Sequence, residues 1–347
     1  MRTVLLFIVT LFFASGASAQ SVSFFEPLTL TVAPDFPEPQ TTITLRVDST
    51  SLDLDRASIA WYADDTLIAE GGGLTETTFT LGPLGSATHI AVVATDLAGE
   101  SESLERTIRP AEVDLLWEAV SYTPPLYQGK RLVSSSSEVR MQALPRLVRA
   151  NGSTIPTSDI IYTWRKNGAL VSDASGRGKA QATFPPPLLF GTDTIQVEAV
   201  SLDGTLTARA SAVIPSRDPQ LVLYHKHPLF GTLYHQALTG EDAIPDVEAA
   251  FVAEPYFAPV HISTDRSLMY TWRVNGTAVA TDATNPNHVT LNAQNSTGAA
   301  RIELKLTHTT DVFLESRGSW NLLLNSRYGG TAQDPFQGTD GFFPGTE

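Results

Sequence analysis

The chain of 347 residues contains no cysteine. This absence excludes disulfide bonds, thiol nucleophiles, thiolate metal sites and iron–sulfur ligation. Secreted domains often rely on disulfides, but a domain of about 100 residues buries enough surface to fold without them. A cysteine-free chain must therefore hold its domains together through packing and hydrogen bonds alone.

Lysine and arginine are also scarce. They number 23 against 37 acidic residues, which gives a formal net charge of −14. Surfaces that bind nucleic acid or anionic membranes need clustered basic side chains, so we expect neither partner. Catalytic motifs are missing too: there is no H-E-x-x-H or G-x-S-x-G, and Gly178-Lys179 lacks the flanking residues of a phosphate loop. We therefore expect no enzyme activity.

Long apolar runs are confined to the N-terminus. Arg2, the apolar stretch Val4 to Phe13 and Ala17-Ser18-Ala19 have the pattern of a secretory signal peptide over residues 1–19, an uncleaved anchor being the alternative. No later segment approaches the roughly 18 apolar residues of a membrane span, so we expect no transmembrane anchor in the mature chain. The sequence thus predicts a protein secreted to the extracellular space or periplasm. Export without cysteine favours a bacterial source.

The most informative feature present is a short unit that occurs three times. Each copy is centred on a tryptophan: Trp61, Trp164 and Trp272. Intervals of 103 residues (164 − 61) and 108 residues (272 − 164) separate them. A repeat of this period predicts three copies of one small domain, each with its tryptophan in the core.

The residues around each tryptophan predict β-structure. β-branched and aromatic residues precede it, as in Ile161 to Trp164. Asn-Gly follows three residues later in copies two and three, which is a strong signal for a tight hairpin, and Asp64-Asp65 takes that place in copy one. About thirty residues further on, each copy has an alternating strand with one apolar face. These strands are expected at 88–94, 193–200 and 300–307.

This arrangement of strand, hairpin and later alternating strand resembles bacterial secreted tandem immunoglobulin-like (Ig-like) and PKD-like β-sandwich modules. The resemblance covers most of residues 22–328. It implies an all-β fold of three tandem Ig-like sandwich domains after the signal peptide. The inter-sheet cysteine pair of antibody domains is missing, and Leu45, Val139 and Val247 are the apolar residues expected in its place on the preceding strand. A shared fold of this kind transfers no activity.

Proline-rich breaks in the alternation set the expected domain boundaries. They fall at Arg109-Pro110-Ala111 and at Pro215 to Pro219. The expected organisation is a signal peptide (1–19), Ig-like domain 1 (22–110), domain 2 (111–216), domain 3 (217–328) and a flexible C-terminal tail (329–347). Because both linkers are short, we expect restricted angles between the modules, as in a rod.

Metal-binding signals are weak. His225 and His227 stand two apart in an expected strand, which places both imidazoles on one face as a metal pair needs, although a half-exposed strand face explains them as well. The acidic pairs Asp53/Asp55 and Asp246/Glu248 suit structural calcium at a module junction, but no calcium-binding loop motif surrounds them. No cofactor is therefore expected, with structural calcium kept as the alternative.

Aromatic residues at the start of copies two and three are the candidate ligand-binding groups. They suit either a carbohydrate platform or simple packing of the module openings. These residues are Trp117, Tyr122, Tyr127, Tyr224, Phe230 and Tyr234.

The sequence therefore favours a non-enzymatic structural or adhesive protein of the cell envelope, with a protein or glycan partner at the cell surface. A carbohydrate-binding module protein, or an accessory subunit of an envelope enzyme or of a secretion or pilus assembly, remain alternatives.

Overall fold

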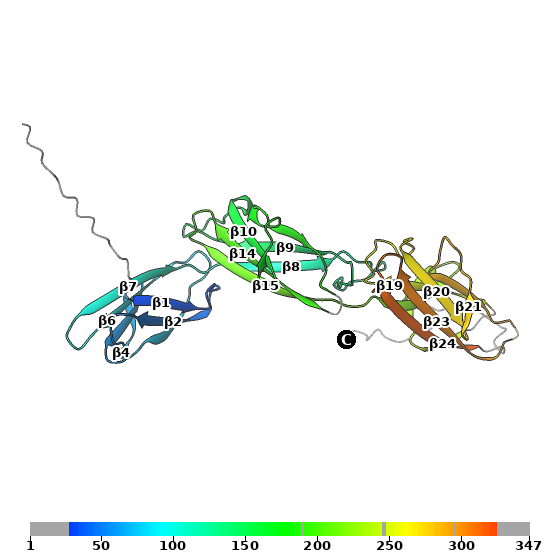
Figure 1. Ribbon diagram of the computed structural model, residues 1–347, viewed down its shortest axis with the longest axis horizontal. Helices are drawn as coiled ribbons and strands as arrows, with labels where there is room; N and C mark the ends of the chain where they lie inside the picture. Colours follow the sequence, from blue (N-terminus) through cyan, green and yellow to red (C-terminus); the bar gives the residue numbers. More distant parts are fainter. Residues whose placement is uncertain (1–27, 189–190, 245–247, 295, 325–347) are drawn as a thin grey trace, which may run out of the picture. The chain divides into compact units, whose positions relative to one another are not determined.

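The computed structural model describes residues 28–188, 191–244, 248–294 and 296–324. Within these ranges the chain is built from β-strands, with one short 3-10 helix at Thr157–Asp159. The predicted all-β fold of tandem Ig-like sandwiches is confirmed (Figure 1). The described part of the chain contains no helix long and apolar enough to cross a membrane. The predicted signal peptide, the predicted tail and Val247 lie outside the described residues.

The chain divides into two compact units. The first unit contains one sandwich, made of a three-stranded sheet with the order β1-β2-β5 and a four-stranded sheet with the order β4-β3-β6-β7. Its strands are β1 (Leu28–Ala33), β2 (Thr42–Ser49), β3 (Ser58–Ala63), β4 (Thr66–Gly72), β5 (Glu76–Thr80), β6 (Thr88–Thr95) and β7 (Ser101–Ile108).

The second unit, which continues from Arg109, contains two further sandwiches. The earlier one pairs a sheet of order β13-β9-β8 with a sheet of order β11-β10-β14-β15, to which β12 adds. Its strands are β8 (Glu112–Ala119), β9 (Val139–Arg146), β10 (Ile160–Lys166), β11 (Ala169–Leu170), β12 (Gly176–Arg177), β13 (Gln181–Phe184), β14 (Thr192–Ser201) and β15 (Thr207–Pro215).

The last sandwich pairs a sheet of order β17-β16-β19-β22 with a sheet of order β18-β24-β23-β20-β21. Its strands are β16 (Gln220–His227), β17 (Gly231–Ala237), β18 (Glu241–Ile244), β19 (Glu248–Tyr256), β20 (Leu268–Val274), β21 (Thr277–Val279), β22 (His288–Asn292), β23 (Gly298–His308) and β24 (Glu315–Leu324). The short β18 runs parallel to β24.

The tryptophan strand is central in all three sandwiches and pairs with the predicted alternating strand. Trp61 on β3 lies opposite Val92, Trp164 on β10 opposite Val197, and Trp272 on β20 opposite Leu304. Their partners β6, β14 and β23 alternate between covered and more open positions, as period-2 sequences require. All three indole rings are buried, with at most 1% of the residue exposed.

Each indole N–H makes the same kind of hydrogen bond. Trp61 Nε1 donates to the carbonyl of Leu74, Trp164 Nε1 to that of Lys179, and Trp272 Nε1 to that of Pro286, each at 2.9 Å. Every acceptor lies two residues before a strand of the opposite sheet, namely β5, β13 or β22. The bond therefore ties the tryptophan sheet to the segment that enters the facing sheet.

The turn after each tryptophan carries a second repeated contact. The residue three positions after the tryptophan is Asp64, Asn167 or Asn275, and each has a positive φ between 48° and 51°. Its side-chain Oδ1 accepts a hydrogen bond of 2.8 Å from a backbone N–H in or beside the alternating strand, at His89, Thr194 or Arg301. Asp and Asn suit this place because they tolerate the left-handed conformation and supply a short acceptor.

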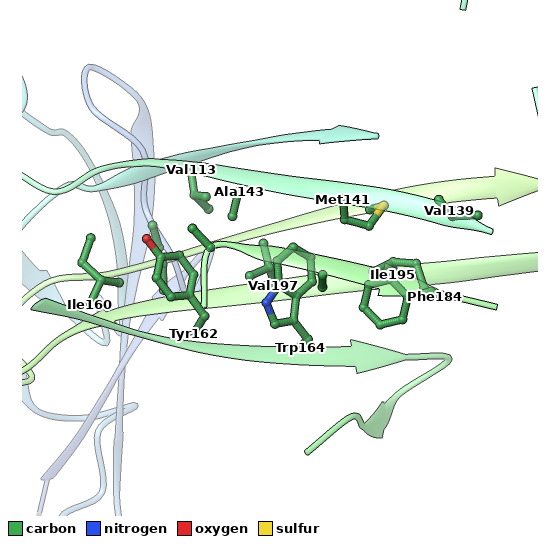
Figure 2. Packing of buried hydrophobic residues seen from close by; sticks show 14 of the residues in the cluster. Val113, Val139, Met141, Ala143, Ile160, Tyr162, Trp164, Phe184, Ile195 and Val197 are labelled. Carbon is green, nitrogen blue, oxygen red and sulfur yellow. The ribbon is translucent and has the colours of Figure 1, made fainter. Parts of the chain in front are cut away.

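The core of the middle sandwich shows how the two sheets interlock (Figure 2). Trp164 and Phe184 contact each other across the interior with ring centroids 5.7 Å apart. Val139 and Met141 on β9 complete the layer from the facing sheet. Leu45 on β2 and Val139 on β9, the residues expected in place of the antibody cysteine, are both buried.

Replacing Trp164 with phenylalanine tests the indole bond. The change leaves the Lys179 carbonyl without its donor and opens a cavity, so we expect a loss of about 2–4 kcal/mol in the free energy of unfolding. Trp117→Phe is the matched control, because this half-buried ring packs at the edge of the same core. Urea unfolding followed by far-UV circular dichroism measures both. Equal losses in the two variants contradict a special role for the Trp164 N–H.

Asn275→Ala tests the turn contact. Alanine loses the Oδ1 acceptor and disfavours the positive φ of 48°, so stability should fall by about 1–3 kcal/mol. Asn275→Asp keeps the acceptor, as Asp64 does in the first sandwich, and should cost less than half as much. Urea unfolding of both variants decides, and an aspartate variant as unstable as the alanine variant rules this explanation out.

Candidate functional site

The densest cluster of polar and aromatic side chains in the described residues surrounds β19. Five successive residues of this strand, Phe251 to Pro255, are buried, so both of its faces are covered there. One of them is Glu254, whose residue surface is 3% exposed. A carboxyl group in such a place needs partners, because burial without hydrogen bonds strongly disfavours its charged form.

Two tyrosine hydroxyls supply those partners. Tyr122 donates to Oε2 of Glu254 at 2.6 Å, and Tyr234 on β17 donates to Oε1 at 3.0 Å. Burial raises the pKa of the Glu254 carboxyl, and the two phenols offset only part of this effect. Burial, with the neighbouring carboxylate, also raises the pKa of Tyr122 above its ordinary value and that of Tyr234 to about 12.

Tyr122 reaches the site from the segment 120–138, which joins β8 to β9 of the middle sandwich. Its backbone bonds to the two residues that follow β19: Tyr122 N–H donates to the Ala258 carbonyl at 2.8 Å, and Phe257 N–H donates to the Tyr122 carbonyl at 2.7 Å. Ser134 Oγ donates to the Phe257 carbonyl at 2.5 Å. The middle and last sandwiches are therefore joined by main-chain as well as side-chain bonds.

The backbone at Phe257 is strained. Its φ is 65°, a left-handed value that a bulky residue rarely adopts. Phe257 N–H donates to the Tyr122 carbonyl and the Phe257 carbonyl accepts from Ser134, so both backbone polar groups of this residue are bonded and its conformation is fixed. Strain persists only where the surroundings over-determine it, and these two bonds provide that constraint.

Further aromatic rings enclose the Glu254 cluster. Tyr224 and Tyr256 share a hydrogen bond of 2.6 Å between their hydroxyl groups, and the Tyr224 ring meets Tyr234 edge-on at 5.4 Å. Tyr127 contacts Tyr256 and Phe257 edge-on, with centroids 5.6 and 5.8 Å apart. Such pairs add stabilisation beyond the area they bury.

Four of the six candidate aromatic residues thus meet at this cluster. Tyr122 and Tyr234 bond to Glu254, Tyr224 meets Tyr234, and Tyr127 packs on Tyr256, so these four rings pack against the junction residues instead of forming an open platform. The structure does not bring the remaining two to the cluster. Trp117 packs against the middle core with Lys130 Nζ 3.3 Å from its ring centroid, and Phe230 stacks on His227.

The two candidate metal-binding histidines are engaged separately. The His225 ring packs against Phe251 at 4.8 Å, and burial lowers its pKa. His227 Nδ1 accepts hydrogen bonds from the N–H groups of Leu229 and Phe230. Within the described residues, no group of three or more potential ligands of the His, Cys, Asp and Glu types gathers around a common point.

Of the two acidic pairs suggested for calcium, the first lies within the described residues and belongs to no such group there. Asp53 Oδ2 lies 3.7 Å from Arg56 Nε in an exposed ion pair. Asp246 lies outside the described residues, so the second pair has no structural account.

Sequence reasoning overlooked Glu254 itself. The available signal was a charged residue inside the otherwise apolar run from Ala249 to Ala258. Chemically, the enclosed carboxyl has both oxygens engaged and little contact with solvent. The arrangement suits a structural joint, because a dissolved substrate does not reach the carboxyl.

Comparison with known proteins gives likeness of fold only. No family model matches the chain, and no curated protein does. Among solved structures, the central fibronectin-III array of RIM-binding protein is 14% identical, covers 84% of this chain and 95% of its own, and has a TM-score of 0.31. The fibronectin(III)-like modules of Clostridium thermocellum CbhA are 13% identical over 55% of this chain and 94% of theirs, with a TM-score of 0.27.

A third structure is the glucan-utilization protein SGBP-B of Bacteroides ovatus, solved with a mixed-linkage heptasaccharide. It is 10% identical, covers 86% of this chain and 70% of its own, and has a TM-score of 0.23. All three scores lie below 0.5, so none of these likenesses assigns a function to this chain.

The buried carboxyl predicts a pH dependence of stability. Because the pKa of Glu254 is raised on folding, the native state binds this proton more tightly than the unfolded state does. The contribution of Glu254 is therefore full below its ordinary pKa near 4.5 and is lost as pH rises through the raised value. Urea unfolding between pH 4 and 8 should show the wild type losing stability relative to Glu254→Gln across this window. A relative gain with rising pH contradicts the assignment.

Proposed function

We propose that this protein is a non-enzymatic extracellular or cell-envelope protein with a structural or adhesive role. The observation that carries the proposal is that the buried Glu254 carboxyl is fully engaged by tyrosine hydroxyl groups. A buried carboxyl with a raised pKa is the kind of group that active sites employ. Here both of its oxygens accept hydrogen bonds from tyrosine hydroxyl groups, and one of these tyrosines, Tyr122, lies on a segment of the middle sandwich.

Three further features support this role. The pattern over residues 1–19 favours export, the repeated sandwich provides a cysteine-free scaffold, and the net charge of −14 favours solubility at a cell surface. The partner is a protein or glycan of that surface. A bacterial source agrees with export without cysteine.

Two experiments test the proposal. The full chain is first expressed with a C-terminal tag in a bacterial host, and the N-terminus of the exported form is sequenced. We expect cleavage before Gln20 and recovery outside the cytoplasm. An Ala19→Asp variant, which disrupts the cleavage motif, should keep its leader.

The purified mature chain is then labelled and added to isolated cell envelopes in increasing amounts. Saturable retention that unlabelled chain displaces is the expected result. An uncleaved cytoplasmic protein, or a mature chain that envelopes do not retain, overturns the proposal. Release of product from envelope polymers by the purified chain overturns its non-enzymatic part.

Glycan binding is the second candidate function, and a groove on the sheet β13-β9-β8 of the middle sandwich favours it. An accessory role in an envelope enzyme or a secretion or pilus assembly is the third. Co-purification of a stoichiometric complex from envelopes would favour that role over the first two.

A further inference from the structure

The outward face of the sheet β13-β9-β8 presents two rows of side chains that cross all three strands. Strand register places Leu116, Gln142 and Gln181 in one row, and Glu118, Arg140 and Thr183 in the next. These rows alternate with core residues such as Met141 and Ala182, so their side chains leave the sheet on the side away from the core.

This face is hollowed. A groove of about 720 Å³ is lined by these six residues together with the intervening positions of each strand. Its volume lies within the range of about 300–1,000 Å³ that is usual for small-molecule sites. Unlike the enclosed Glu254 cluster, the groove opens to solvent.

Two arginines on β9 show how this groove differs from the rest of the face. Arg146 is held by ion pairs to Glu112 and to Asp114, the latter at 3.1 Å. The guanidinium of Arg140, six residues earlier on the same face, forms no hydrogen bond or ion pair with any described residue, although its main chain is paired within the sheet. Glu118 lies directly opposite Arg140 in the register and has no such partner in the described chain either.

Gln181 and Thr183 of β13 are exposed beside Arg140 and likewise make no side-chain hydrogen bond with the described residues. The groove therefore collects hydrogen-bond donors and acceptors from a guanidinium, a carboxylate, an amide and a hydroxyl within three adjacent strands. The exposed Leu116 adds an apolar contact at one corner.

We infer that this groove binds a neutral oligosaccharide. Guanidinium, carboxylate and amide groups each offer a planar pair of hydrogen-bonding positions, which suits the neighbouring hydroxyl groups of a sugar ring. A polyanionic glycan fits less well, because Glu118 shares the groove and the chain carries a net charge of −14. The inference rests on the proposed surface role and names the ligand class for it.

The test uses the mature full chain on a printed array of neutral and acidic oligosaccharides, followed by isothermal titration calorimetry with the neutral oligosaccharide that binds best. Arg140→Ala and Gln181→Ala should each raise the dissociation constant at least tenfold. Arg146→Ala is the matched control, since it lies on the same strand and face but outside the groove, and should change the constant less than twofold. Thermal unfolding by circular dichroism verifies that all variants are folded.

Several outcomes overturn the inference. These are an array on which no neutral oligosaccharide binds, binding that survives both groove substitutions, and binding confined to acidic glycans. A dimer of the chain that Arg140→Ala dissociates, seen by light scattering without glycan binding, assigns the groove to a second copy instead. Envelope retention that Arg140→Ala leaves unchanged also overturns this inference while the proposed function stands. If envelopes retain no form of the chain while glycan binding is intact, the proposed function is overturned and this inference stands.

Discussion

The indole N–H of each repeat tryptophan donates to a carbonyl 13 to 15 residues later, where the chain is about to enter the opposite sheet. Antibody domains join their two sheets with a disulfide at the core, packed against a tryptophan. This chain has no cysteine, and the tryptophan contributes both the packing and the link. Since a buried carbonyl without a donor is strongly unfavourable, the bond also fixes the path of the crossing segment. The strands that follow, β5, β13 and β22, begin two residues further on in every case.

Polar side chains in the second unit are of two kinds. Some have all their hydrogen bonds within the fold, and others are exposed without a side-chain partner in the described chain. Glu254 belongs to the first kind, because Tyr122 and Tyr234 occupy both oxygens and the strained Phe257 is clamped beside it. The side chains of Arg140 and Gln181 belong to the second kind, since no side-chain hydrogen bond or ion pair to the described chain engages them in the open groove. This contrast is why the junction is assigned a structural role and the groove a ligand. The same side-chain chemistry serves different ends according to burial and partners.

Much of the fold is predictable from local sequence, because its determinants are local. Trp164, Asn167-Gly168 and the alternation from Asp193 to Val200 define a strand, a turn with positive φ and a partner strand without reference to distant residues. The spacing from the tryptophan already places Asp64 where copy two has Asn167, but the side-chain contact that both residues make to a strand about 25 residues away emerges only from the structure. The junction is still less predictable. Glu254 and Tyr122 are 132 residues apart, and no local pattern indicates that they meet.

Hydrogen exchange at the tryptophan indole N–H groups tests the central claim most directly. The chain has five tryptophans, so a ¹⁵N-labelled sample is expected to give five indole signals, which single Trp→Phe variants assign. Trp117 serves as the internal reference, because its ring lies at the edge of the middle core beneath Lys130. We predict that the indole protons of Trp61, Trp164 and Trp272 exchange far more slowly than that of Trp117, in step with the global opening of their sandwiches. Exchange of any of the three as fast as that of Trp117 would contradict the view that these bonds tie the sheets together.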